Sequence, residues 1–439
     1  VTAALVTAGT LVEVTDATVT ISDNPTISEL NDIAAKTTGV VTATLAAASL
    51  ADLGALNTAG TDQITITVSD ADAAAVTAAN LSALGGKTAG TVTVTNAVAI
   101  TGDHDQLTAA LVTNGTKVEV SDATVTVNDA DGVAITAAEL SAIGGATTGT
   151  VTVTNAVAVT GDHDQLTAAL VTAGSKVVVS DATATVNDAD GVAISATELS
   201  AIGGATTGTV TVTNAVAITG DHDQLTAALV TAGTKVSVSD AAVTINDADA
   251  TAIAATELSA IGNATTGTVT VTNAVAITGD HDQLTAALVT AGTKVEVSDA
   301  AVTINDADAT GITAAELSAI GGATTGTVTV TNAVAITGST AQVTAALVTA
   351  GTLVVVSDAA VTINDTPTIT ELNNIAAKTT GVVTATLAAA SLADLGALNT
   401  AGTDAITITV NDADAAAVTA ANLSALGGKT AGTVTVTNA

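Results

Sequence analysis

The motif with the clearest potential for chemistry is a short acidic run, Asn-Asp-Ala-Asp, which recurs along the chain. It begins at Asn128, Asn187, Asn246, Asn305 and Asn411, and a close variant begins at Ser69. Carboxylate and amide oxygens in a tight loop are hard ligands that suit Ca²⁺. We therefore predict calcium at these loops, with the candidate ligands Asp70, Asp72, Asn128, Asp129, Asp131, Asn187, Asp188, Asp190, Asn246, Asp247, Asp249, Asn305, Asp306, Asp308, Asn411, Asp412 and Asp414.

The same aspartates have a second explanation that needs no metal. Asp129 or Asp131 would accept free backbone N–H groups ahead of a helix, as helix caps do. The spacing is not that of an EF-hand loop, and the Gly-Gly-x-Gly-x-Asp nonapeptide of calcium β-rolls is absent. In a stack of turns we expect the acidic loops to lie along one edge, where their mutual repulsion favours bound cations.

A second motif, Gly-Asp-His-Asp-Gln, contains all four histidines, His104, His163, His222 and His281. An Asp-His-Asp run could bind a transition metal or take part in acid–base chemistry. We expect these histidines in every second turn, about 10 Å apart, which is too far to share one ion. Asp105 is expected to be a helix N-cap, and the equivalent run after Gly338 contains no histidine.

Threonines in Thr-x-Thr patterns are the third candidate, because ladders of hydroxyls on a flat solenoid face resemble those of ice-binding proteins. Threonine is also a favourable residue for any exposed strand face. Lys117 and Glu119 are expected one turn away from Thr150 and Thr152, where they would interrupt such a face. Every candidate site is repeated, and no phosphate loop or nucleophile elbow is present, so we predict that the chain is not an enzyme.

Composition restricts the class of protein. The 439 residues include 8 Lys, no Arg and 42 Asp or Glu, giving a net charge of −34, which argues against nucleic-acid binding. Cysteine, methionine and all aromatic residues are missing, yet 48% of the residues are hydrophobic, which is too many for a disordered chain. No apolar run approaches the ~18 residues of a transmembrane helix. A thin repeat protein with a narrow aliphatic core fits this composition.

Internal repeats support that reading of the composition. Thr-Val-Thr-Val-Thr-Asn-Ala begins at Thr91, Thr150, Thr209 and Thr268, so 59-residue units start at 91, 150, 209 and 268. Residues 343–439 repeat residues 1–97 with about nine substitutions, so a super-repeat of 342 residues covers 1–342. Both ends of the chain fall within a repeat. We therefore expect one continuous solenoid over 1–439, cut from a longer chain.

A finer period is marked by a glycine before each β-like run, at spacings that are mostly 25 and 34 in alternation. Between Gly115 and Gly149 we predict strands at 117–120 and 124–127, a loop at 128–132 and a helix at 136–143, capped by Thr136 with Glu139. The following segment, which ends at Gly174, repeats this order: strands at 150–153 and 157–160, a loop at 161–165 and a helix at 166–171.

These elements predict a right-handed parallel β-solenoid, an α/β-solenoid of about 16 coils with two short strands and one short helix per coil. Stacking identical coils is expected to produce two parallel sheets and one helical face.

The units Thr-Ala-Ala-Leu-Val-Thr-Ala-Gly-Thr and Leu-Ser-Ala-Ile-Gly-Gly-Ala-Thr-Thr-Gly-Thr-Val resemble repeats of giant secreted bacterial surface proteins, particularly cyanobacterial adhesin-like proteins exported by type I secretion. The resemblance implies an extracellular or cell-surface location, a role in a fibre or surface layer, and dependence on Ca²⁺. We therefore expect a structural rod of an extracellular filament, surface layer or adhesin. Its partners would be other copies of itself and divalent cations; the alternative is a binding module for calcium-dependent adhesion or ice.

Overall fold

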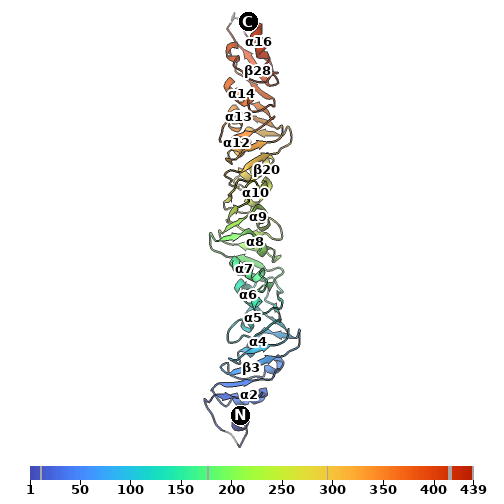
Figure 1. Cartoon of the computed structure of the whole chain (residues 1–439), viewed down its shortest axis with the longest axis vertical. Coiled ribbons are helices and arrows are strands. Elements are labelled where there is room, and N and C mark those ends of the chain that lie inside the picture. Colours follow the sequence, from blue (N-terminus) through green and yellow to red (C-terminus); the bar gives the residue numbers. More distant parts are fainter. Residues whose placement is uncertain (10–11, 176, 294, 414–417, 438–439) are drawn as a thin grey trace. The chain divides into compact units, whose positions relative to one another are not determined.

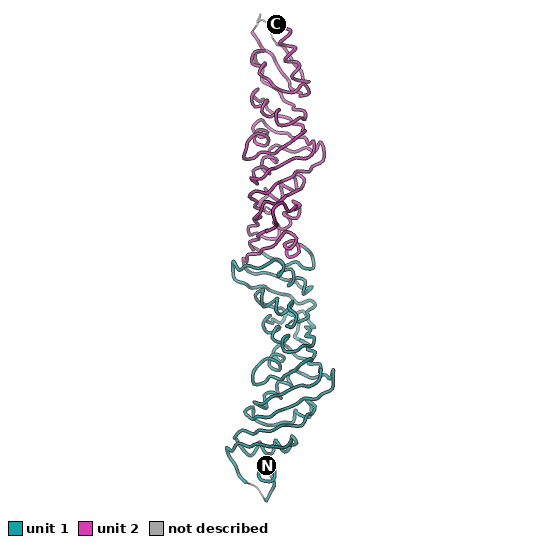
Figure 2. Tube along the Cα trace, in the orientation of Figure 1, with its two compact units in different colours: residues 1–214, 231–238 teal, residues 215–230, 239–439 magenta. Residues whose placement is uncertain are grey.

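The computed structural model describes residues 1–9, 12–175, 177–293, 295–413 and 418–437, and shows a repeat α/β solenoid built from short parallel strands and short helices (Figure 1). The chain forms two compact units (Figure 2). The first contains residues 1–214 and 231–238, and the second contains residues 215–230 and 239–439. Among the described residues, no helix combines the length and the apolar character needed to cross a bilayer.

Three parallel sheets and eight helices make up the first unit's described part. In pairing order, the sheets are β1 (Val19–Thr20), β2 (Val41–Thr44), β3 (Gln63–Val68), β5 (Val92–Val94); β4 (Ala75–Thr77), β6 (Ala99–Gly102), β7 (Thr124–Val127), β9 (Val151–Val153), β11 (Val177–Val178); and β8 (Ala134–Thr136), β10 (Ala158–Gly161), β12 (Thr183–Val186), β14 (Val210–Val212), β16 (Val236–Ser237). Strand β13 (Ala193–Ser195) follows, and the helices are α1 (Thr2–Leu5), α2 (Ile27–Ala34), α3 (Leu50–Leu53), α4 (Ala78–Gly85), α5 (His104–Leu111), α6 (Ala137–Gly145), α7 (His163–Leu170) and α8 (Ala196–Gly203).

The second unit has the same construction. Its strands pair in the orders β15 (Ala217–Gly220), β17 (Ala242–Ile245), β19 (Val269–Val271); β18 (Ala252–Ala254), β20 (Ala276–Gly279), β21 (Ala301–Ile304), β23 (Val328–Val330), β25 (Val354–Val355); and β22 (Gly311–Thr313), β24 (Ala335–Gly338), β26 (Ala360–Ile363), β27 (Val383–Thr386), β28 (Ala405–Val410), β29 (Val434–Val436). Its helices are α9 (His222–Leu229), α10 (Ala255–Gly262), α11 (His281–Leu288), α12 (Ala314–Gly321), α13 (Thr340–Leu347), α14 (Ile369–Ala376), α15 (Leu392–Leu395) and α16 (Ala420–Gly427).

Strand register shows how long one turn of the solenoid is. Val76 pairs with Ile100, Ile100 with Val125, Val125 with Val151, and Val151 with Val177. Each of these steps covers 24 to 26 residues, the same separation that hydrogen bonds between neighbouring turns span here. Between β1, β2 and β3, and between β26, β27 and β28, the steps are 21 or 22 residues. The expected alternation of 25- and 34-residue coils is wrong, because stacking each buried aliphatic residue on its counterpart in the next turn requires turns of nearly equal length.

Each turn in this region has three successive elements. The turn that begins at β4 continues through α4 and β5, whereas the turn that begins at β7 continues through β8 and α6. A 59-residue repeat supplies seven elements: five strand segments and two helices. Each turn places its three elements on three sides of the solenoid, so seven elements fill two turns and one side of a third turn. Each repeat therefore starts one side, about a third of a turn, beyond the previous one.

The prediction of two short strands and one short helix per turn is confirmed on average, but the expected single helical face is wrong. Helices pack as pairs, α4 on α5 and α6 on α7, and the two pairs occupy different positions in the turn. Equivalent strands also lie in different sheets, since β4 and its repeat β8 begin separate sheets. The cause is that the 59-residue repeat is not a whole number of turns.

Local elements match the sequence patterns closely. Strand β7 buries Val125 and Val127 and turns Thr124 and Thr126 outward, as period-two alternation predicts. Thr136 caps α6 as expected: its hydroxyl accepts the Glu139 N–H at 3.2 Å, and the Glu139 carboxylate accepts the Thr136 N–H at 3.0 Å. The predicted strand at 117–120 is reduced to one bridge between Thr93 and Glu119. Strand β8, by contrast, was not expected, since it lies between the predicted loop at 128–132 and the predicted helix start at 136.

Glycine residues allow adjacent turns to approach closely at the corner after helix α6 and after its equivalents α8, α10 and α12. A Cβ on Gly144 would lie 2.0 Å from the backbone oxygen of Ser175 in the next turn. A Cβ on the neighbouring Gly145 would have no atom within 4 Å beyond its own helix and chain neighbours. Gly144 therefore has no room for a side chain, whereas Gly145 has, although the two are adjacent in one Gly-Gly pair.

We predict that Gly144→Ala destabilises the first unit by about 3 kcal/mol or more, because the methyl group forces the two backbones apart. Gly145→Ala is the matched control and should be neutral or stabilising by up to ~1 kcal/mol, because alanine favours the end of helix α6. Urea unfolding of the two variants checks this. Equal destabilisation would contradict the close approach at Gly144.

Candidate functional site

The acidic loop between β7 and β8 contacts the preceding turn through Asp129. One carboxylate oxygen accepts the backbone N–H of His104 at 2.8 Å, and the other lies 2.7 Å from His104 Nδ1. Asp129 is 6% exposed, so its charge is held within the structure by these two contacts. A carboxylate at the first N–H groups of helix α5 is also favoured by the helix dipole.

The same contact recurs at every equivalent loop. The pairs His163–Asp188, His222–Asp247 and His281–Asp306 each have the backbone bond at 2.8 Å and the ring contact at 2.6–2.7 Å. In the fifth repeat Thr340 replaces histidine and donates to Asp365 through both its N–H and its hydroxyl. Asp70 and Asp412 accept the backbone N–H groups of Leu50 and Leu392 in the variant repeats.

The remaining residues of the loop contact the neighbouring turns. Asn128 donates its N–H to the Gly102 oxygen of the preceding turn at 3.0 Å. Asp131 accepts the N–H of Ala156 in the following turn at 3.1 Å, and the Asn155 side chain donates to the Asp129 backbone oxygen. One loop therefore joins three successive turns. We call this set of contacts the inter-turn clasp.

The other predicted ligands occupy equivalent places. Asp72, Asp249 and Asp308 accept the N–H groups of Ala97, Ala274 and Ala333, and Asp190 also has an interaction partner. Asn187, Asn246 and Asn305 donate their N–H groups to Gly161, Gly220 and Gly279, and Asn411 donates to Ala390. Asp414 lies outside the described residues.

The structure gives these acidic residues a hydrogen-bonding role and does not test the calcium prediction. Within the described ranges, no three His, Cys, Asp or Glu side chains gather closely enough to hold a metal ion. The expected edge of stacked acidic loops is wrong, since each repeat advances by one side. Successive acidic loops within a unit therefore lie on different sides of the solenoid, and so do the histidines that contact them.

The histidine motif differs from expectation in its N-cap. Asp103, not Asp105, caps helix α5 by accepting the Gln106 N–H at 2.8 Å. Asp105 lies one residue inside the helix with 87% of its side chain exposed, and its carboxylate is 3.7 Å from His104 Nε2. The His104–Asp129 pair was not expected from the sequence. Its separation of 25 residues, one turn, was the signal that could have found it.

Electrostatics around the histidine ring are asymmetric. Burial lowers the pKa of His104, but the hydrogen bond that its ring donates to Asp129 and the charges of Asp129, Asp105 and Glu139 raise it more, so the pKa lies above its ordinary 6.5. The pKa values of His163, His222 and His281 are raised for the same reasons. Protonated imidazole therefore strengthens each clasp.

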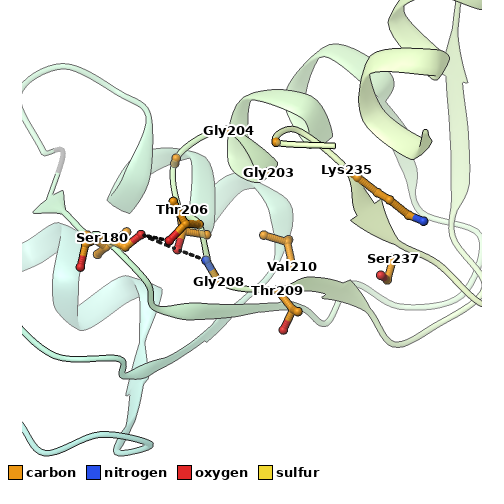
Figure 3. Close-up of a pocket in the computed structure, with 13 residues that line it drawn as sticks. Ser180, Gly203, Gly204, Thr206, Gly208, Thr209, Val210, Lys235 and Ser237 are labelled. Carbon is orange, nitrogen blue, oxygen red and sulfur yellow. Dashed lines mark hydrogen bonds between the residues drawn. The ribbon is translucent and has the colours of Figure 1, made fainter. Parts of the chain in front are cut away.

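Grooves open at the glycine corners of the first unit. Figure 3 shows one of about 700 Å³, lined by Ser180, Gly203, Gly204, Thr206 and Lys235, where Thr206 bonds the Ser180 backbone oxygen and the Gly208 N–H. A groove of about 690 Å³ lies at the equivalent corner one repeat earlier, around Gly144 and Gly149. This repetition indicates that small corner residues create the grooves wherever that corner recurs.

No protein family matches the chain, and no curated protein is similar to it.

We predict that Asp129→Ala weakens the clasp, because it leaves the His104 N–H buried without an acceptor, at a cost of about 1–3 kcal/mol. Asp122→Ala, which removes an exposed aspartate whose described partner is its neighbour Ser121, should change stability by less than ~0.5 kcal/mol. Amide hydrogen exchange at the first turn of α5 measures the local effect. Equal protection in both variants would rule out the clasp as a stabilising contact.

We also predict that stability falls as pH rises. A raised histidine pKa means that its stabilisation is complete below about 6.5, the unfolded value, and is lost as pH passes the higher folded value. Thermal unfolding between pH 6 and 8.5 should show this decline. Replacing His104, His163, His222 and His281 by Thr, which the fifth repeat tolerates, should flatten it. A slope unchanged by these substitutions would assign the decline to other groups.

Proposed function

We propose that this chain is a structural segment of an extracellular filament, surface layer or adhesin, and that its role is mechanical, without catalysis. The observation that carries the proposal is the inter-turn clasp. The same contacts between backbone, aspartate and asparagine join successive turns in repeat after repeat of both units. A chain selected for a unique binding or reaction site would concentrate unusual residues at one place, whereas here every unusual residue is repeated.

Load can pass between turns through two kinds of contact. Parallel ladders join each strand to the next turn, and the clasp adds charged hydrogen bonds where the chain leaves a strand for a loop. Charged hydrogen bonds contribute about 1.5–3 kcal/mol each, roughly twice the neutral kind. Because each repeat advances by one side, successive clasps within a unit lie on different sides of the solenoid.

The negative charge of the chain also supports this structural role. The net charge of −34 keeps copies apart until cations or a specific contact joins them. We propose other copies of the chain and divalent cations, Ca²⁺ included, as partners. The repeat units resemble those of secreted bacterial surface proteins, which supports the extracellular location.

The alternative of ice binding rests on the threonine columns. Register places Thr77, Thr101, Thr126 and Thr152 in one column across four strands, and Val178 follows on the fifth. Each column is therefore short. The clasp, which is shared by all repeats, favours the structural role.

Location in the source organism tests the proposal. An antibody against the 59-residue repeat should label intact cells or material released from them, and protease added to intact cells should digest the protein. Labelling restricted to permeabilised cells would contradict an extracellular structural role. A cytoplasmic protein with a β-solenoid domain is the control for cell integrity.

Calcium dependence is a separate prediction. The melting temperature in millimolar Ca²⁺ should exceed that in EDTA, because an ion bound only by the folded chain adds ~2.7 kcal/mol per site at 100 times its dissociation constant. Mg²⁺ at the same concentration is the control for general charge screening. Equal melting temperatures in Ca²⁺ and EDTA would contradict the calcium prediction and would indicate that the aspartates act only through hydrogen bonds.

A further inference from the structure

The imidazole of His104 is held in one orientation with one nitrogen facing outward. Asp129 accepts from Nδ1 at 2.7 Å, so Nδ1 carries the proton and Nε2 holds the free electron pair when the ring is neutral. A carboxylate on the far ring nitrogen is the arrangement that orients metal-binding histidines and raises their basicity.

The outward nitrogen faces a carboxylate that has no other task among the described residues. Asp105 Oδ1 lies 3.7 Å from His104 Nε2, and 87% of the Asp105 side chain is exposed. The helix is already capped by Asp103. Asp105 is therefore available to an ion at the ring nitrogen.

The same pair occurs four times with nearly identical geometry. The Nε2 to carboxylate distances are 3.6–3.7 Å in His163–Asp164, His222–Asp223 and His281–Asp282. Each ring is 13–14% exposed and each paired aspartate is at least 85% exposed.

The fifth repeat separates structural from chemical requirements. Its helix α13 keeps an N-cap, Ser339, and the cross-turn acceptor Asp365. It loses histidine and the exposed aspartate together, since Thr340 and Ala341 stand in their places. Folding of this region therefore requires neither residue, and their joint loss indicates a shared role.

We infer that each histidine and the aspartate that follows it form a two-ligand site for a divalent transition-metal ion such as Zn²⁺ or Ni²⁺. A tetrahedral ion at ~2.1 Å from both atoms needs them about 3.4 Å apart, so a shift of a few tenths of an ångström suffices. Imidazole nitrogen selects such ions over Ca²⁺. Asp103 and Asp129 add negative charge that offsets the positive end of the helix dipole.

Two protein ligands leave coordination positions for water or for a group from a second copy. The ion site and the clasp share the histidine: its N–H and Nδ1 contact the clasp aspartate, and its Nε2 faces Asp105. Because Asp105 takes no part in the clasp, the ion site can fail without the proposed structural role failing. Its recurrence gives the full chain four equivalent sites.

Calorimetric titration of the full chain with ZnCl₂ at pH 7.5, in excess Ca²⁺, tests the inference. We expect four equivalents of Zn²⁺. Replacing all four histidines by Thr should remove them, and the fifth repeat shows that threonine preserves the contact to the clasp aspartate. Replacing Asp105, Asp164, Asp223 and Asp282 by Asn should weaken binding at least tenfold while leaving the melting temperature unchanged.

A matched variant removes the same charge elsewhere in the same repeats. Asp122, Asp181, Asp240 and Asp299 are exposed, and each accepts a hydrogen bond from the serine before it. Their replacement by Asn should leave Zn²⁺ affinity within twofold of the parent. Equal weakening in both aspartate variants would overturn the site in favour of diffuse attraction. Absence of Zn²⁺ binding at millimolar concentration, or binding that survives the histidine substitutions, would also overturn it.

Discussion

Register between successive turns is the constraint on which the rest of this structure depends. The core consists of small and medium aliphatic side chains, without an aromatic residue to fill a wider space. Such a core is well packed only when each Val, Ile or Leu rests on its counterpart one turn away. The resulting steps, 24 to 26 residues in the regular repeats, determine which glycines meet a neighbouring backbone, which threonines form columns and which aspartates reach a helix in the preceding turn.

The 59-residue repeat is not a whole number of turns, and much of the architecture follows from that mismatch. Seven elements distributed three to a turn carry each repeat one side further round. Sheets in the regular region therefore end after about five strands, and helices occur in pairs. Identical sequences thus occupy rotated positions within a unit, so a feature repeated in the sequence is distributed around the solenoid.

Negatively charged side chains occupy two different environments around each clasp histidine. Asp129 and its equivalents are buried against helix N-termini and a histidine ring, where hydrogen bonds and the helix dipole compensate for lost hydration. Asp105 and its equivalents remain exposed beside the same ring. Two aspartates on opposite sides of one imidazole therefore have different tasks: the buried one orients the ring, and the exposed one leaves an accessible pair of ligand atoms.

The sequence alone determined the class of fold and many local elements. Period-two alternation located β7 and β9, and the Thr136–Glu139 capping box located α6, because these signals involve residues that are close in the chain. The start of α7 was placed too late in the chain, since Asp162 and Asp164 are both suitable caps by type. The turn length, the different sides on which helix pairs lie and the pairing of His104 with Asp129 became evident from the three-dimensional packing. These depend on which residues stack across a whole turn, and that choice is made by the packing of the aliphatic core.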